Sequence, residues 1–209
     1  MGKVSILSKA EEFLSKQPFD AGHDLEHHQT VKAVALDISD HLEEKIDKEA
    51  LEIAAMWHDV VTESDINPNT TDRNQIKLKT CDYLEKLLHE MGYENEFIER
   101  TILAVRYHSY EDEPRNIEGR VLYDADKLSA VDLARWKKVV LAHNAGKLSD
   151  ENFNTYITAG KQWLSEMTTK LHFKYSQQLF VSRMTEIAND EWAKQLALSI
   201  GVDLTTYLH

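Results

Sequence analysis

The stretch Asp47–Val60 reads DKEALEIAAMWHDV, and it decides the fold class. Its apolar residues recur with the period of an α-helix, which places Leu51 and His58 on one stripe. Asp47 is a suitable N-cap for this helix, because its side chain can accept a backbone N–H of the first turn. His58 stands on the stripe that faces the core, and Asp59 follows at once. An imidazole on an apolar face costs stability unless its nitrogens find partners, so this helix end predicts either a satisfied core histidine or a binding site.

The helical period continues on both sides of this stretch, and the sequence predicts one all-α domain over residues 1–209. Ser8 with Glu11 is typical of a capping box that opens the first helix, and Gly92 and Gly146 are suitable residues to end two others. No alternating strand pattern is present, so the expected fold class is an all-α helical bundle. The helices are expected at about 8–17, 24–42, 47–59, 72–91, 95–109, 118–145 with room for one break, 149–172, 173–188 and 191–199, with a loop at 63–71.

Composition excludes several classes of protein. The chain has 209 residues, with 24 Lys+Arg against 36 Asp+Glu and a formal net charge of −12. Non-specific nucleic-acid binding depends on a basic surface, so this charge argues against a nucleic-acid partner. The one cysteine, Cys81, excludes an internal disulfide framework and fits a reducing compartment. No stretch approaches the roughly 18 apolar residues of a membrane span and no signal-peptide pattern is present, so the expected location is the cytoplasm.

Two further polar residues occupy positions where the helical pattern is apolar. His27 lies one turn before Val31 on the inward stripe of its helix, and Asp126 falls inside an apolar helical pattern. A buried carboxylate is rarely unpaired, so either a salt bridge or a metal ion is expected beside Asp126. With His58 and Asp59, these residues make a mixed nitrogen and oxygen donor set that suits Mn, Fe, Co, Ni or Zn. Four protein ligands leave positions open for water and substrate.

The neighbours of His27 are interpreted differently. His28 points elsewhere on the helix and is expected to be exposed. Asp24 belongs to a second His-Asp dipeptide, but it is better explained as the N-cap of the helix than as a metal ligand.

The order of a His, a His-Asp pair and a distant Asp resembles the HD superfamily of metal-dependent phosphohydrolases, in particular its small bacterial single-domain members. The resemblance covers about residues 20–135 and implies an HD-type helical fold. The C-terminal helices at about 148–209 are expected to pack on that region. The matching stretches are Gly22–His27, Met56–Val60, Tyr107–Ser109 and Glu118–Leu128.

The resemblance also implies a metal centre and a reaction. The implied ligands of one divalent ion (Mn, Fe, Co, Ni, Zn or Mg) are His27, His58, Asp59 and Asp126. The implied reaction is hydrolysis of a phosphate ester or pyrophosphate bond in a small phosphorylated molecule, with a nucleotide favoured, by metal-activated water.

Other residues are candidates for proton transfer and substrate binding. Glu63, in the loop four residues after Asp59, and Asp124 are the candidate catalytic carboxylates. His108 shares the inward stripe of its helix and matches a recurrent histidine of the superfamily. The candidate substrate-binding residues are His108, Lys79 and Lys127.

Two other functions stay open, namely an HD-fold di-iron oxygenase and a non-catalytic nucleotide-binding regulatory module. Two-metal sites in this superfamily usually require two more histidines between the His-Asp pair and the last Asp. Only His89 and His108 lie in that interval, and His89 falls on a polar face. A single-ion site is therefore favoured. An all-α interaction domain with core histidines is a third interpretation. The expected partner is a small phosphorylated molecule, without a membrane or nucleic acid, and homodimer formation is left open.

Overall fold

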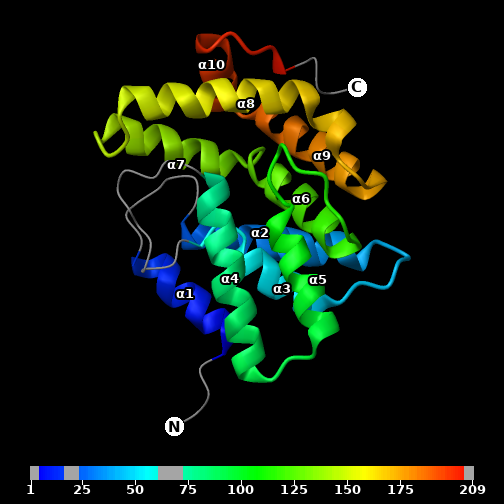
Figure 1. Cartoon of the computed structure of the whole chain (residues 1–209). Coiled ribbons are helices and arrows are strands. Elements are labelled where there is room, and N and C mark those ends of the chain that lie inside the picture. Colours follow the sequence, from blue (N-terminus) through cyan, green and yellow to red (C-terminus); the bar gives the residue numbers. More distant parts are fainter. Residues whose placement is uncertain (1–4, 17–23, 61–72, 205–209) are drawn as a thin grey trace. The chain divides into compact units, whose positions relative to one another are not determined.

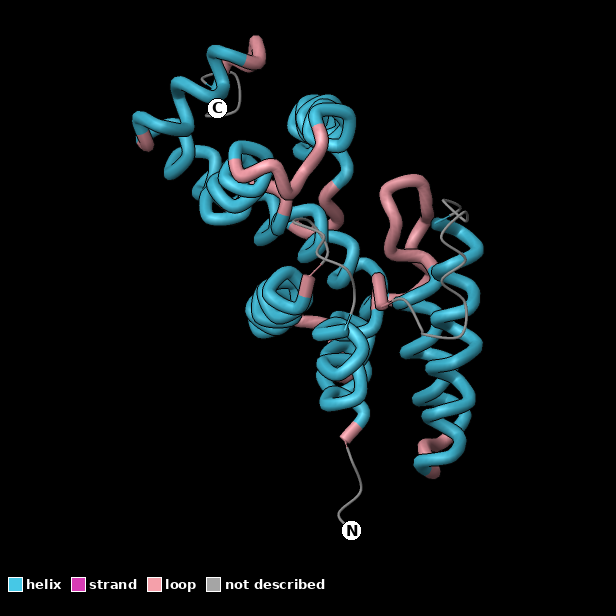
Figure 2. Tube along the Cα trace, turned by 90° about the vertical axis from the view of Figure 1, so that its left-hand side faces the viewer, coloured by secondary structure: helices cyan, strands magenta, loops and turns pink. Residues whose placement is uncertain are grey.

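The computed structural model of the chain describes residues 5–16, 24–60 and 73–204. These residues form helices joined by loops and contain no strand (Figure 2). The all-α prediction is therefore confirmed. The helices, labelled in Figure 1, are α1 (Ile6–Lys16), α2 (Leu25–Asp40), α3 (Lys48–Trp57), α4 (Arg73–Met91), α5 (Asn95–Arg106), α6 (Ile117–Ser129), α7 (Leu133–Asn144), α8 (Asp150–Lys170), α9 (Lys174–Asn189) and α10 (Glu191–Ser199).

The chain divides into two compact units, Met1–Ala125 and Asp126–His209. The division falls inside α6, which is one continuous helix. Among the described helices, none combines the length and the apolar character that a bilayer crossing requires. That the chain works as one domain stays a prediction.

Helix α3 is the centre of the first unit and packs against α1, α2 and α5. Its residues from Ile53 to Trp57 are all buried, and each large apolar side chain removed from water contributes about 1.5–3 kcal/mol. The Trp57 indole N–H donates to the carbonyl oxygen of Ile6 at 3.2 Å, and its ring stacks on Tyr83 with 5.8 Å between centroids. The end of α3, from which the His-Asp pair follows, is therefore held by packing on several sides.

Two N-caps that the sequence predicts are confirmed. The Asp47 side chain accepts the backbone N–H of Ala50 at 3.1 Å at the start of α3. The Asp24 side chain accepts the backbone N–H of His27 at 3.1 Å at the start of α2. Each cap satisfies one of the N–H groups that a helix start leaves without an intrahelical partner.

The start of the first helix differs from the prediction. Helix α1 begins at Ile6, and the Ser5 hydroxyl accepts the backbone N–H of Ser8 at 3.1 Å. Ser8 therefore lies inside the helix rather than at its cap. The cap lies at Ser5 rather than at Ser8, because Ser5 offers the same hydroxyl acceptor three residues earlier.

The long helix expected at 118–145 breaks once. Helix α6 ends at Ser129 and α7 begins at Leu133. The Asp132 side chain caps α7 by accepting the backbone N–H of Arg135 at 3.0 Å. A capping aspartate in the middle of an apolar pattern thus marks where the chain changes direction.

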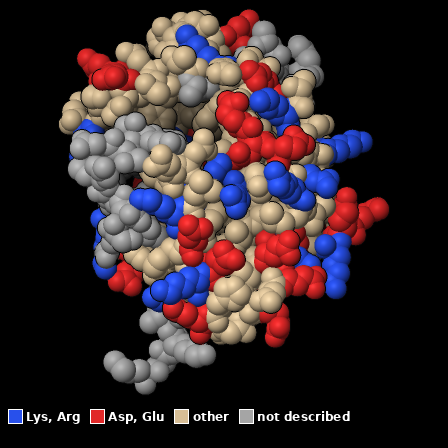
Figure 3. Space-filling model, viewed as in Figure 1, with Lys and Arg blue, Asp and Glu red and all other residues tan. Residues whose placement is uncertain are grey.

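Helix α9 is central in the second unit and packs against α7, α8 and α10. Phe180, Met184 and Ile187 recur on its buried face at helical spacing. The Arg183 guanidinium donates to the carbonyl oxygen of Leu128 at 2.5 Å, which ties α9 to the end of α6. On the face of the molecule in Figure 3, the described Lys and Arg side chains lie among Asp and Glu side chains.

Candidate metal centre

Three helix ends of the first unit carry the predicted histidines. His27 lies in the first turn of α2, His58 follows the last residue of α3, and His108 lies two residues beyond α5. All three side chains are buried, with 6%, 0% and 2% of their surface exposed. Asp59 follows His58, and its side chain is 30% exposed. Thr80 of α4 donates its hydroxyl hydrogen to the carbonyl oxygen of Val60 and so holds the segment just after Asp59.

Hydrogen bonds to the main chain fix the proton on two of these rings. The Nδ1 atom of His58 lies 2.7 Å from the carbonyl oxygen of Ala55, and Nδ1 of His108 lies 2.6 Å from that of Val105. A carbonyl oxygen can only accept, so Nδ1 of each ring must carry the hydrogen. In the neutral imidazole the lone pair then sits on Nε2, the nitrogen on the other side of the ring.

These Nε2 atoms converge on the carboxylate of Asp59. The Nε2 atom of His108 lies 3.3 Å from Oδ1 of Asp59, and Nε2 of His58 lies 3.7 Å from Oδ2. The potential ligand atoms of His58, Asp59 and His108 all lie within 4.8 Å of one another. Electron-pair donors that face one another in a buried site repel unless a proton or a cation lies between them.

His27 faces the same group from α2. Its Nε2 atom lies 3.2 Å from Nε2 of His58, and the two ring centroids are 5.2 Å apart. Because Nδ1 of His58 carries a hydrogen, either His27 donates to His58 or both nitrogens share a cation. Imidazole nitrogens with a carboxylate are a donor set that a divalent transition-metal ion prefers, so the residues present fit a metal ion.

The last predicted ligand belongs to the second unit. Asp126 is its first residue, on the continuous helix α6. One carboxylate oxygen of Asp126 lies 2.5 Å from the Lys127 ammonium, which also lies 5.8 Å from the centre of the Trp163 ring. The Lys127 ammonium is thus already engaged by Asp126. That Asp126 binds the ion and that Lys127 binds substrate both stay predictions.

The remaining candidate residues differ in their surroundings. Asp124 is fully buried on α6, whereas Lys79 is exposed on α4. Glu63 lies outside the described residues. The catalytic roles of Glu63 and Asp124 and the substrate-binding role of Lys79 stay predictions.

The expectation that His28 is exposed is wrong. His28 is fully buried, its Nδ1 atom lies 3.2 Å from the carbonyl oxygen of Met56, and its ring centroid lies 4.4 Å from that of His58. The reason is that the apolar stripe of α2 is wide enough for two adjacent residues. His28 lies three residues before Val31, a spacing that shares a helix face, and this signal was available in the sequence.

A second group that sequence reasoning missed lies beside His108. The ammonium of Lys77 on α4 lies 2.5 Å from the carboxylate of Asp112 and 3.1 Å from the hydroxyl oxygen of Ser109. Asp112 also accepts the backbone N–H of Ser109 at 3.1 Å. These bonds hold the turn that follows His108 against α4. The one sequence signal is an aspartate three residues after a serine, a common turn pattern.

Comparison with known proteins adds a family and a fold. The sequence model of the HD domain matches residues 24–131. No curated protein matches the chain. Among solved structures, Bacillus subtilis YpgQ in complex with ADP is 20% identical, with a TM-score of 0.63 over 93% of this chain and 97% of that chain.

Further solved structures are similar. A second structure of Bacillus subtilis YpgQ is 19% identical, with a TM-score of 0.63 over 93% of this chain and 95% of that chain. A predicted HD superfamily hydrolase from an uncultured Thermotogales bacterium is 24% identical, with a TM-score of 0.54 over 78% of this chain and 91% of that chain. At these identities the similarity shows a shared fold.

Proposed function

Because the chain belongs to the HD-domain family, we propose that it is a metal-dependent phosphohydrolase that acts on a small phosphorylated molecule. The observation that carries the proposal is the convergence of the His58 and His108 Nε2 atoms on the Asp59 carboxylate. Three buried or half-buried electron-pair donors that face one another lower the stability of the fold unless a cation lies between them. Such an arrangement is therefore expected where a bound cation takes part in catalysis.

The proposed ligands are His27, His58, Asp59 and Asp126. The first three belong to one unit. Asp126 is the first residue of the other unit and is proposed as the fourth ligand from the resemblance to the HD superfamily. When bound, a divalent ion supplies Lewis acidity to a phosphoryl oxygen and lowers the pKa of a coordinated water. The main-chain bond to Nδ1 of His58 holds its ring in the ligating tautomer before any ion arrives.

Other residues of the site would act on protons and phosphate. The Nε2 atom of His108 is able to accept a proton or a hydrogen bond from water or from a protonated phosphate oxygen, because its Nδ1 hydrogen is committed to the carbonyl oxygen of Val105. Asp124 and Glu63 are the proposed carboxylates for proton transfer, and Lys79 and Lys127 the proposed cations for the phosphate. A chain with a net charge of −12 needs such local cations to hold an anionic substrate.

We favour a nucleotide as the substrate class. The resemblance to small single-domain HD phosphohydrolases favours this choice, and YpgQ, which shares the fold, was solved in complex with ADP. Nucleoside mono-, di- and triphosphates are therefore the first substrates to test.

The test is phosphorus NMR of a mixed nucleotide pool with Mn²⁺ and the full chain. We expect wild type to release pyrophosphate or orthophosphate, and His58→Ala to lose at least about 100-fold in rate, as expected when a ligand of a catalytic metal is removed. His89→Ala is the matched control, because His89 is exposed on α4 and lies outside the site. An unchanged pool with wild type, or equal rates in wild type and His58→Ala, would contradict the proposal.

Metal content gives a readout that does not depend on finding the substrate. We expect one Mn²⁺ per chain in wild type and in His89→Ala, and strongly reduced binding in His58→Ala. Two ions per chain would instead add His108 to the ligand set.

A further inference from the structure

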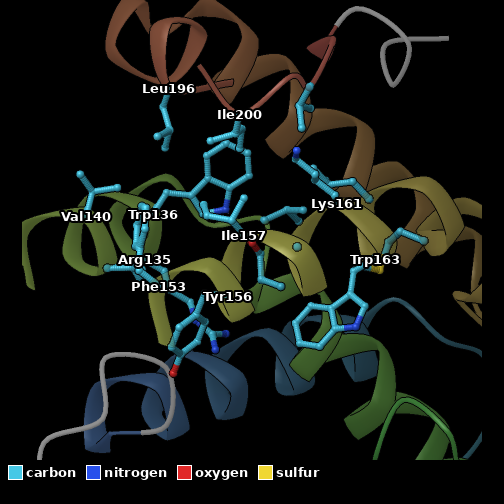
Figure 4. Close-up of a pocket in the computed structure, with 17 residues that line it drawn as sticks. Arg135, Trp136, Val140, Phe153, Tyr156, Ile157, Lys161, Trp163, Leu196 and Ile200 are labelled. Atoms are coloured by element: carbon cyan, nitrogen blue, oxygen red, sulfur yellow. Dashed lines mark hydrogen bonds between the residues drawn. The ribbon is translucent and has the colours of Figure 1, made fainter. Parts of the chain in front are cut away.

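The second unit contains an apolar cavity that the proposed phosphohydrolase does not use. Its volume is about 110 Å³, and it lies between α7, α8 and the chain around α10, entirely within Asp126–His209. For scale, an engineered cavity of about 150 Å³ in another protein binds benzene. In Figure 4 the aromatic rings of Trp136, Phe153, Tyr156 and Trp163 are among the side chains around the cavity.

Two of the polar groups in the walls are hydrogen bonded within the protein. The Trp136 indole N–H donates to the carbonyl oxygen of Ala130 at 2.8 Å. The Arg135 guanidinium donates to the hydroxyl oxygen of Ser129 at 2.6 Å. The walls therefore offer an occupant mainly apolar surface, as small-molecule sites do.

A glycine keeps part of this space open. Gly160 lies in the middle of α8 and lines the cavity, and a Cβ added to it meets no atom within 4 Å. A glycine inside a helix costs about 0.5–1 kcal/mol relative to alanine. Neither a positive φ nor a close neighbour requires glycine here. The missing side chain of Gly160 leaves open space on the side of α8 that faces the cavity.

The charge of the lining residues selects the kind of occupant. The two charged residues that line the cavity, Arg135 and Lys161, are both basic, and none of the described acidic residues lines it. Lys161 is exposed and follows Gly160, and in Figure 4 its side chain extends toward the Trp136 indole. An ammonium at the edge of an apolar cavity complements an apolar body with one anionic group.

We propose that this cavity is a binding site for a small amphiphilic carboxylate. The apolar chain or ring lies against Trp136 and above Gly160, and the carboxylate pairs with the ammonium of Lys161. A single carboxylate matches the one cation at the edge, because Arg135 is engaged by Ser129. The site does not depend on the metal centre or on the reaction proposed for it.

The first test is titration of the full chain with octanoate, below its micelle-forming concentration, followed by NMR of the tryptophan indole groups. Trp136 and Trp163 line the cavity, whereas Trp57 and Trp192 do not and serve as internal references. We expect saturable shifts of the two lining indoles. Octanamide, the neutral isostere, should bind about two- to fivefold more weakly at low salt, the range of an exposed ion pair. No saturable shift with octanoate, or equal shifts of all four indoles, would overturn the proposal.

Two variants test the two halves of the site. Gly160→Leu fills the cavity and should weaken both ligands about tenfold or more, because the occupant then overlaps a side chain. Lys161→Met should remove the preference for octanoate over octanamide. Lys174→Met, at an exposed lysine of α9 outside the cavity, should keep that preference. If Gly160→Leu does not fold, Lys161→Met decides alone, and a preference that survives in it overturns the assignment.

Discussion

His58 and Asp59 are neighbours in the chain with opposite surroundings. The His58 side chain is fully buried, while that of Asp59 is 30% exposed. The buried ring is held by its bond to the Ala55 carbonyl, so it is oriented without an ion. The partly exposed carboxylate keeps a route to solvent, from which a cation can arrive. Together they make a site that is rigid on one side and accessible on the other.

Asp59→Asn should lower Mn²⁺ affinity at least about tenfold, because a neutral amide is a poorer ligand for a divalent cation than a carboxylate. Isothermal titration of the metal measures the effect. Asp82→Asn, at an exposed aspartate of α4, is the matched control and should bind as wild type does. Equal affinities in the three proteins would remove Asp59 from the ligand set.

Cys81 is expected to be unreactive in the folded protein. It is 2% exposed on α4, and burial raises the pKa of its thiol to about 12. At pH 8 the reactive thiolate is then about one part in ten thousand, against roughly a quarter for a free cysteine. A thiol reagent such as Ellman's should label the folded chain slowly and the urea-unfolded chain at once. Fast labelling of the folded chain would show that α4 opens readily.

A glycine follows the end of α4, and another lies inside α8, and the two have opposite effects on helix stability. Gly92 follows the last residue of α4 with φ of +84°, a conformation that side-chain-bearing residues rarely adopt. Gly160 lies inside α8 with open space where a Cβ would stand. Glycine therefore ends helix α4 at position 92 and lowers the stability of helix α8 at position 160.

The two alanine substitutions should therefore change stability in opposite directions. Gly92→Ala should lower the free energy of unfolding by about 1 kcal/mol, because alanine is strained at positive φ. Gly160→Ala should raise it by about 0.5–1 kcal/mol, because alanine loses less backbone entropy in a helix. Urea denaturation of both variants beside wild type measures the signs. A destabilised Gly160→Ala would mean that the space above Gly160 is not open in solution.

The net charge of the whole molecule is unevenly placed. The unit Met1–Ala125 has 27 Asp+Glu against 14 Lys+Arg, whereas Asp126–His209 has 9 Asp+Glu against 10 Lys+Arg. The acidic unit is also the one that holds the His58–Asp59–His108 group. The negative field of this unit attracts cations and repels anionic substrates. A cation bound there would be stabilised by the field and would reduce the repulsion of an anionic substrate.

Moderate salt should therefore stabilise the protein. Raising NaCl from about 20 to 200 mM shortens the Debye length from about 20 to 7 Å and weakens the repulsion among the acidic residues. We expect the Tm to rise by about 2–4 °C, which corresponds to about 1 kcal/mol for a chain of this size. Calorimetry at the two salt concentrations checks this, and a fall in Tm would show that attractive ion pairs outweigh the repulsion.

The sequence alone determined the helical class, most helix bounds and the inward position of three histidines, although it misplaced His28. The caps at Asp24 and Asp47 and the glycine at Gly92 act within four residues of themselves, so local spacing is enough to place them. His27, His58 and His108 stand on apolar stripes, and each is buried as predicted. The start of α1 was misplaced because two serines offered equivalent caps.

Only the tertiary structure decided which of these residues meet. The contact between Asp59 and His108 joins residues that are far apart in sequence, and it exists because α3 packs against α5. The Lys77–Asp112 pair likewise depends on how α4 lies beside the turn after α5. The helical period predicts that a side chain points inward, but it does not predict which residue of another helix that side chain contacts. That information lies in the packing of helices on one another, which no local spacing contains.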